Sequence, residues 1–262
     1  MRGGAQSHLI QASDDHYYVV KFRNNPQHRR ILVNELIAAE ILKYLQIAAP
    51  PSELVQISAD FLRDHPEVRI QLGSQHIVPD MGWAFGSRYP GDPNLTAVYD
   101  FVPDTLLGQV ENRQDFLAAL VFDKWAGNAD GRQSIFFRAQ LQQWAPQLKP
   151  KPRKMGFVAL MIDHGFIFNG PHWNFIESAV QGVYPRRSVY DPVVGLESFE
   201  PWLTRVREFP EEVVDAAWRR IPPAWLEGEE DELERVLKML LDRRRRVPDL
   251  LDQCAALFPN WR

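Results

Sequence analysis

Residues 17–22 read Tyr-Tyr-Val-Val-Lys-Phe, and after a polar turn the segment from Arg29 to Leu45 carries apolar residues at helical spacing. The first stretch is rich in aromatic and β-branched residues, which is typical of a strand. The second gathers its apolar residues on one face of a helix, and two prolines follow its end. The sequence therefore predicts a strand that carries Lys21 and a helix that follows it.

The rest of the chain extends this into an α+β pattern. Further strands are predicted at 54–57, 68–72 and 157–162, and helices at 114–125, 198–206, 210–219, 229–246 and 248–257. Strands dominate the first part and helices the second. We predict a single domain over residues 1–262, with a small strand-containing N-lobe (1–90) and a mostly helical C-lobe (91–262). A run of four arginines, 243–246, is expected on a solvated helix face.

The composition excludes several classes of protein. Hydrophobic residues make up 45% of the 262 residues and the formal net charge is −4, so neither disorder nor general nucleic-acid binding is favoured. The only cysteine, Cys254, rules out an intramolecular disulfide. No signal peptide and no membrane-spanning stretch is expected. We predict a soluble, cytoplasmic protein without direct nucleic-acid or membrane binding.

Residues before and within the first predicted helix suggest a phosphate site. A glycine-containing segment allows backbone amides to approach a phosphate, and it comprises Gly3, Gly4, Ala5, Gln6 and Ser7; a simple N-terminal tail is the alternative. Lys21 could reach the same phosphates, and a helix glutamate usually supports such a lysine. Glu35 is the candidate, because Glu40, five residues later, points about 140° away around the helix.

Two acidic segments complete the pattern. Asp123, Asn128 and Asp130 lie where an apolar helix runs into a glycine-containing loop, and Asp163 follows the apolar strand at 157–162. Phosphoryl transfer needs carboxylates that hold magnesium and one that orients the attacking hydroxyl. Turn formation and helix capping are the alternative roles for such residues. His164 is expected to pack or to hydrogen-bond, because a lone histidine offers no metal cluster.

In this order the motifs Gly4-Ala5-Gln6-Ser7, Val-Val-Lys21-Phe, Asn34-Glu35-Leu36, Asn128-x-Asp130 and Asp163-His164-Gly165 resemble those of the HipA-like kinases. The resemblance covers roughly residues 3–175. It implies a bilobal protein-kinase-like fold with ATP and Mg²⁺ in the cleft. It further implies that Lys21 binds phosphates, that Glu35 supports Lys21, that Asp163 ligates magnesium and that Asp130 is catalytic. The hinge that holds adenine would lie at residues 81–86, with Phe85 and Gly86 as contacts.

One position departs from this family. A magnesium-binding asparagine is expected five residues after the catalytic aspartate, and Ile135 stands there. Gln133 or Asn128 could take its place. Alternatively Asp123 and Asn128, which have the expected spacing, define another register in which Asp123 is catalytic. We favour Asp130, because Asp123 still belongs to the preceding helix.

The resemblance points to an ATP- and magnesium-dependent protein Ser/Thr kinase. The alternatives are a small-molecule or lipid kinase and a nucleotide-binding pseudokinase, the last motivated by Ile135. The acceptor, protein or small molecule, is not identified by the sequence. Because HipA toxins are restrained by a DNA-binding antitoxin, an antitoxin-like regulator is a further implied partner.

Overall fold

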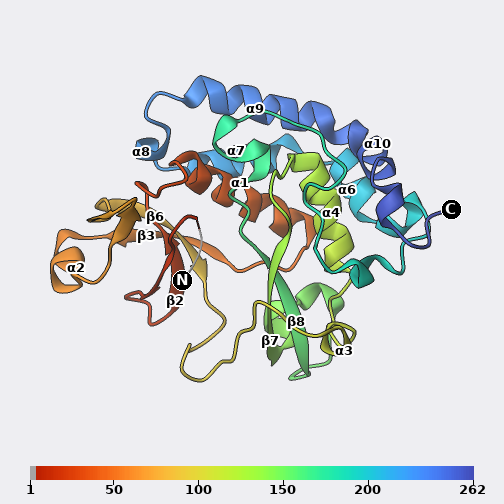
Figure 1. Ribbon diagram of the computed structural model, residues 1–262, viewed down its shortest axis with the longest axis horizontal. Coiled ribbons are helices and arrows are strands. Elements are labelled where there is room, and N and C mark those ends of the chain that lie inside the picture. Colours follow the sequence, from red (N-terminus) through yellow and green to blue (C-terminus); the bar gives the residue numbers. More distant parts are fainter. Residues whose placement is uncertain (1–3) are drawn as a thin grey trace.

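The computed structural model describes residues 4–262, and Figure 1 shows how its elements are arranged. The chain is α+β, as predicted. A four-stranded antiparallel sheet has the order β1-β2-β6-β3, and a separate two-stranded hairpin pairs β7 with β8. The strands are β1 (His8–Gln11), β2 (Tyr17–Lys21), β3 (Ser52–Ile57), β4 (Ile70–Leu72), β5 (Gln75–Ile77), β6 (Gly82–Arg88), β7 (Gln133–Gln140) and β8 (Met155–Ile162).

Helices occupy most of the second part of the chain. In Figure 1 the sheet lies at the left with α2, and α9 runs along the top above the other helices. The α-helices are α1 (Arg30–Leu45), α2 (Ala59–Asp64), α3 (Asp104–Leu107), α4 (Asp115–Ala126), α5 (Leu141–Trp144), α6 (Trp202–Arg207), α7 (Glu211–Arg220), α8 (Pro223–Leu226), α9 (Glu230–Asp242) and α10 (Val247–Asp252). Short 3₁₀ turns connect several of them.

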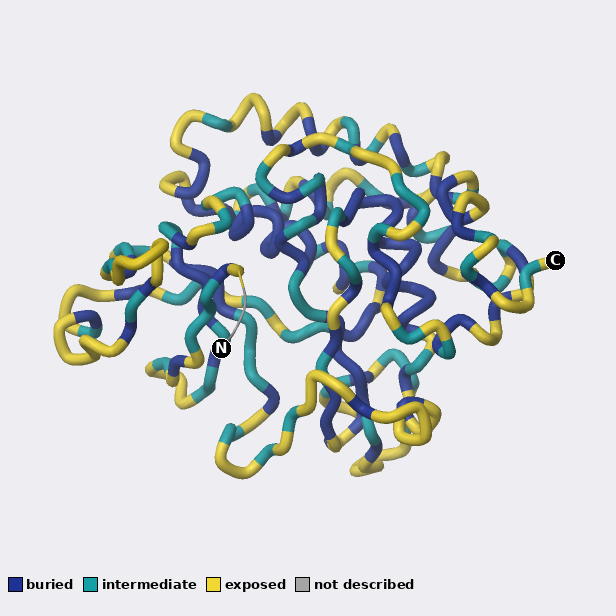
Figure 2. Tube along the Cα trace, viewed as in Figure 1, coloured by how far each residue is buried: buried dark blue, intermediate teal, exposed yellow. Residues whose placement is uncertain are grey.

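Helix α1 is the element that joins the sheet to the helical part. Nearly every residue of its apolar face, such as Leu32, Leu36 and Ile41, is fully buried in one large core that also contains α4, α6, α7 and α9. The buried stretches of the tube in Figure 2 run through the same region. A smaller core of Tyr18, Val20 and neighbouring residues lies on the other face of the sheet. The side of the sheet that faces α1 therefore rests on the main core.

Several predicted boundaries need correction. Strand β6 extends through residues 86–88, although glycine and proline nearby are typical of a loop, because its pairing with β2 continues to Arg88 and its pairing with β3 to Ser87. The arginine run is not a uniformly solvated face, because Arg243 is buried and donates to the carbonyl oxygens of Lys124 and Trp125. Arg243 also forms an ion pair with Glu177 at 2.9 Å. None of the helices in residues 4–262 combines the length and the apolar character needed to cross a membrane.

Candidate functional site

A cavity of about 420 Å³ lies between the sheet, α1 and the β7–β8 hairpin. One end is apolar and the other is charged. Its apolar lining comprises Val19, Ala39, Ala49, Pro50, Phe85, Pro90, Val98, Ile135 and Ile162. Its polar lining includes Gly4, Ser7, Lys21, Gln27, Glu35, Ser87, Asp130, Gln133 and Asp163. The cavity thus gathers candidate residues from six separate segments of the chain.

Lys21 is the centre of the charged end. It is buried on β2, and its Nζ lies 2.5 Å from Oε1 of Glu35 and 2.8 Å from Oδ1 of Asp163. Burial alone would lower the pKa of Lys21, but the two carboxylates outweigh it and raise that pKa above its ordinary value. Lys21 therefore remains a cation that can face a phosphate. The expected Lys21–Glu35 pair is present, and Asp163 joins it.

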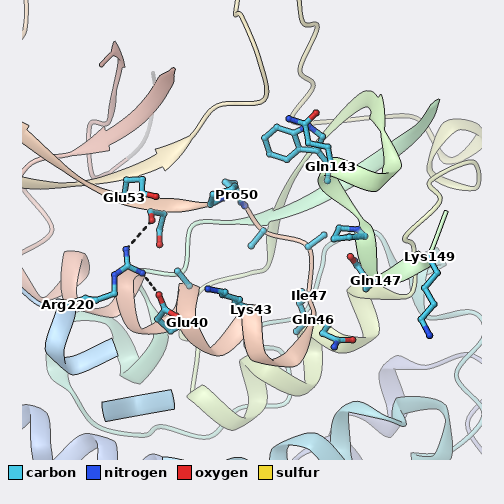
Figure 3. Close-up of a pocket in the computed structure, with 17 residues that line it drawn as sticks. Glu40, Lys43, Gln46, Ile47, Pro50, Glu53, Gln143, Gln147, Lys149 and Arg220 are labelled. Atoms are coloured by element: carbon cyan, nitrogen blue, oxygen red, sulfur yellow. Dashed lines mark hydrogen bonds and ion pairs between the residues drawn. The ribbon is translucent and has the colours of Figure 1, made fainter. Parts of the chain in front are cut away.

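The choice of Glu35 over Glu40 agrees with the geometry of α1. Glu40 projects into a different cavity of about 810 Å³, where it forms an ion pair with Arg220 of α7, as Figure 3 shows. Ala49 and Pro50 line both cavities and separate them. The two glutamates therefore have different partners, as their angular separation on the helix predicted.

The turn that carries Asp163 is held by buried hydrogen bonds. The backbone of Asp163 has a φ of 59°, a left-handed conformation that is uncommon outside glycine but tolerated by aspartate. The next backbone N–H, that of His164, donates to Oε2 of Glu35 at 3.1 Å. Glu35 therefore binds the lysine with one oxygen and fixes the turn with the other. Positive charge from Lys21 and Arg132 overcomes burial and lowers the pKa of Asp163 below its ordinary value.

His164 is a hydrogen-bonding residue, as expected. Arg132 can only donate, so the contact between its Nη1 and Nδ1 of His164, at 3.0 Å, makes Nδ1 an acceptor. Nε2 then carries the proton and donates it to the carbonyl oxygen of Met161 at 3.0 Å. Burial and the charge of Arg132 keep the pKa of His164 well below its usual value. The ring is thus neutral, and both of its nitrogens are engaged in hydrogen bonds within the protein.

Asp123 and Asp130 have different environments. Asp123 is 1% exposed on α4 and forms a two-point ion pair with the equally buried Arg132, whose Nε lies 2.8 Å from Oδ2. Gly182 passes so close that a Cβ there would lie 2.3 Å from the Cβ of Asp123. Asp130 is exposed and lines the cavity. Only Asp130 is accessible to a substrate, which favours it over Asp123 for a catalytic role.

Gln133 lies between the two cavity carboxylates. Its Nε2 is 3.3 Å from Oδ2 of Asp163 and 3.4 Å from Oδ2 of Asp130. The β7–β8 register explains this position, because Gln133 pairs with Ile162, the residue before Asp163. Side chains two apart on a strand share a face, so Ile135 lines the cavity as well, as an apolar wall.

Asn128, the other candidate for a metal ligand, is fully buried outside the cavity lining. Its Nδ2 donates to Oδ1 of Asp123 at 2.9 Å, and its Oδ1 accepts from the backbone N–H of Asp130 at 3.2 Å. Both ends of the amide are therefore engaged in shaping the loop. The geometry favours Gln133 over Asn128 as a group that could face a cation.

The glycine-containing segment is only partly at the cavity. Gly4 and Ser7 line it, whereas Gly3 lies outside the described residues. Ala5 is buried and absent from the lining. Gln6 points elsewhere, because its amide makes two hydrogen bonds to the backbone of Gln71, at 2.6 and 2.7 Å. Gln6 anchors this segment to the β4–β5 hairpin and does not contact the cavity.

Of the two residues predicted to contact adenine, one lies at the cavity. Phe85 lines the cavity, but Gly86 does not; a Cβ on Gly86 would meet Val55 and Tyr18 on the opposite face of the sheet. The alternation of side chains along β6 explains the difference. Of residues 81–86 only Phe85 lines the cavity, and residues 87–90 line it as well.

Two residues with central positions were not predicted as functional. Arg132 links Asp123, the carbonyl oxygen of Ile162 and His164. Asn34 is fully buried on α1 and donates to the carbonyl oxygens of residues 165, 167 and 170, at 2.7 to 3.1 Å. The sequence does carry a signal for Asn34, which stands next to Glu35 on a helix face otherwise made of apolar residues. A buried amide at such a position needs hydrogen-bond partners.

The polar end of the cavity fits a hydrated magnesium ion bound together with phosphates. Within residues 4–262 no group of three or more His, Cys, Asp or Glu side chains forms a self-sufficient metal site. Magnesium is commonly held by one or two carboxylates, water and substrate phosphates. Asp163 would supply such an oxygen ligand, and Gln133 would do so only with its amide turned over, because its Nε2 faces the carboxylates of Asp130 and Asp163 here.

Comparison with known proteins gives one match. The family model described as HipA-like kinase matches residues 1–254, nearly the whole chain. No curated protein matches the chain. The matched range includes every residue of the cavity described above.

Proposed function

Because this chain belongs to the HipA-like kinase family, we propose that it is an ATP- and magnesium-dependent protein kinase that phosphorylates serine or threonine. The observation that carries this proposal is the contact of Lys21 with both Glu35 and Asp163 in one cavity. A cation held by two carboxylates, with an open polar space beside it, is suited to a metal-bound triphosphate.

In this proposal the domain is bilobal and protein-kinase-like, with residues 1–90 as the N-lobe and 91–262 as the C-lobe. The antiparallel sheet in the first part and the helices in the second support this division. The apolar end of the cavity would take the base and the charged end the phosphates. Gly4 and Ser7, which border the charged end, are positioned to approach the phosphates.

Each polar residue then has a defined role. Lys21 binds the phosphates and Glu35 holds Lys21 in place. Magnesium, held by Asp163 with Gln133 and Asp130 nearby, would neutralise charge on the phosphates. Asp130 orients the acceptor hydroxyl and accepts its proton. The acceptor oxygen forms a bond to the γ-phosphorus, the bond from that phosphorus to the β,γ-bridging oxygen breaks, and ADP leaves.

A protein acceptor is supported by the exposure of Asp130 at the mouth of the cavity, where an extended polypeptide can approach. We further propose a cytoplasmic location, which the buried free thiol of Cys254 is compatible with. An antitoxin-like regulator remains a prediction from the family resemblance.

The test is transfer of ³²P from γ-labelled ATP in the presence of Mg²⁺, to the chain itself and to casein as a generic acceptor. Asp130→Asn and Asp163→Asn should each reduce transfer at least about 100-fold. Phosphoamino-acid analysis should find phosphoserine or phosphothreonine. Asp215→Asn, on an exposed position of α7, is the matched control and should leave transfer unchanged. Undiminished transfer in both site variants would remove the assignment.

Asp123→Asn separates the two aspartates by a different measurement. It should lower the free energy of unfolding by about 3–5 kcal/mol, because it removes the buried partner of Arg132. Asp130→Asn should leave stability within about 0.5 kcal/mol of the wild type, since it changes an exposed side chain. Denaturant unfolding at neutral pH measures both.

A further inference from the structure

The base end of the cavity has an unusual polar lining. Val19 and Ile135 can cover the two faces of a flat ring, and Ala49, Pro50 and Val98 close the sides. The edge of a ring placed there would meet residues 87–90. These residues therefore decide which base is accepted, an inference that rests on the proposed nucleotide-binding function.

The backbone of this edge has no free N–H donor between residues 88 and 91. The N–H of Arg88 donates to the carbonyl oxygen of Pro51 at 2.9 Å, and that of Tyr89 donates to Tyr17 at 2.7 Å. The N–H of Gly91 donates to the carbonyl oxygen of Tyr89 at 2.9 Å. Pro90, which is buried against the cavity, has no N–H at all.

The absence of a free backbone N–H matters because adenine and guanine differ at the edge of the ring that would face residues 87–90. Adenine accepts a hydrogen bond at N1 and donates one from its 6-amino group, whereas guanine donates at N1 and accepts at O6. A fixed backbone N–H opposite N1 would favour adenine and oppose guanine, because two donors would face each other. Without such a donor this source of discrimination between the two bases is lost.

Side-chain hydroxyls are available in its place. Ser87, near the end of β6, and Tyr89, just after that strand, both line the cavity, as Phe85 does. Neither hydroxyl forms a hydrogen bond with any other group in the part of the chain that the structure describes, residues 4–262. A hydroxyl can donate or accept by rotating. It can therefore satisfy either purine edge.

We propose that this site reads the purine through the hydroxyls of Ser87 and Tyr89, that Pro90 withholds the backbone donor, and that ATP and GTP consequently bind with similar affinity. Pro90 is then a specificity-determining residue, although it makes no polar contact itself. Loss of the donor removes the penalty against guanine as well as the preference for adenine.

The test is titration calorimetry of the full chain with Mg·ATP and Mg·GTP. The wild-type Kd values should agree within about fivefold. Pro90→Ala restores an N–H and should raise the preference for ATP over GTP by about five- to tenfold, the value of one net hydrogen bond. Pro93→Ala, a loss of proline three residues further that lies outside the cavity lining, is the matched control and should leave the ratio unchanged.

Ser87→Ala and Tyr89→Phe test the hydroxyls directly. Together they should weaken both nucleotides by similar factors, and the ratio of the two Kd values should stay near that of the wild type. A wild-type preference for ATP above about fivefold, or no change of ratio in Pro90→Ala, would overturn the inference while leaving the kinase proposal intact. Absence of binding by both nucleotides would reject the proposed function and this inference with it.

Discussion

Lys21 brings together two carboxylates that lie 14 and 142 residues away along the chain, Glu35 and Asp163. The charge of each of these three side chains is stabilised by the other charges, because a buried charge needs an opposite charge nearby. The same principle explains Asp123, whose charge is matched by Arg132 and is not available for chemistry. At the scale of single residues, access to the cavity separates the functional carboxylates from the structural one.

Asp115, at the start of α4, is a buried carboxylate without a cation. Its Oδ2 accepts from the backbone N–H of Ala48 and from the amides of Asn112 and Gln147, while Oδ1 is buried without a partner among residues 4–262. Burial raises its pKa from 3.8 to about 6. The native state therefore binds this proton more tightly than the unfolded state, so the stabilising contribution is complete at low pH and is lost as pH rises through about 6.

Asp115→Asn should remove this pH dependence. Between pH 5 and pH 8 the wild type should lose about 1.4 kcal/mol of stability through Asp115, whereas the variant should not. The free energy of unfolding of the variant relative to the wild type should thus increase by about that amount from pH 5 to pH 8. Urea unfolding at the two pH values measures it. Asp215→Asn serves as an exposed control, and the same relative change in that variant would contradict the assignment to Asp115.

Among the secondary-structure elements, helix α1 positions two parts of the site. Glu35 reaches the cavity, and Asn34 beside it holds the segment that follows Asp163 by its three carbonyl contacts and by accepting a hydrogen bond from Trp173 Nε1 at 2.9 Å. The helix therefore fixes both the lysine and the turn that carries the magnesium candidate. Strand β7 contributes in a similar way, because its pairing with β8 sets Gln133 beside Asp163.

Asn34→Ala should lower the free energy of unfolding by about 3 kcal/mol, because it leaves several buried carbonyl oxygens and the Trp173 indole without partners. Denaturant unfolding measures this loss. Asn94→Ala, at an exposed turn, should stay within about 0.5 kcal/mol of the wild type. Equal stability of the two variants would show that the Asn34 contacts contribute little.

Gln133→Leu should raise the Mg²⁺ concentration needed for half-maximal activity by about tenfold, since it removes the amide between Asp130 and Asp163. The measurement is phosphoryl transfer at fixed ATP over a range of Mg²⁺ concentrations. Gln140→Leu changes an exposed glutamine at the far end of the same strand and is the matched control. An unchanged Mg²⁺ requirement in Gln133→Leu would exclude this residue from the cation site.

At the scale of the whole molecule, the cavity is formed by parts of the chain that fold into different elements. β2, β6, α1 and the β7–β8 hairpin each contribute a wall. A ligand that contacts all of them binds only the native arrangement, so its binding free energy adds to the stability of the entire fold. Lys21 and Asp163 lie 142 residues apart along the chain. They are in contact only when the sheet and the β7–β8 hairpin are both packed in their native positions.

Mg·ATP at a concentration 100-fold above its Kd should therefore stabilise the protein by about 2.7 kcal/mol and raise Tm by about 5–10 °C. Lys21→Met should abolish most of this shift, whatever its effect on the Tm of the free protein. Lys43→Met, on the same helix as Glu35 but beside the second cavity (Figure 3), should keep the shift. A full shift in Lys21→Met would place the nucleotide elsewhere.

The amino-acid pattern alone predicts the α+β class, the strand of Lys21, the helix of Glu35 and the two acidic segments near Asp130 and Asp163. These follow from local periodicity, because burial of one face repeats every two residues in a strand and every 3.6 in a helix. The family resemblance added the order of the motifs, and the match over residues 1–254 confirmed the family.

Residues that the local pattern treats alike are distinguished by the folded arrangement of the chain. The fold leaves Asp130 exposed and buries Asp123, places Gln133 but not Asn128 in the cavity lining, and brings Phe85 and residues 87–90, but not Gly86, to the cavity. Each of these outcomes depends on what a distant segment presents to the side chain, such as Arg132 against Asp123 or Ile162 against Gln133. Such pairings arise when whole elements pack together, so they cannot be predicted from the spacing of residues along one element.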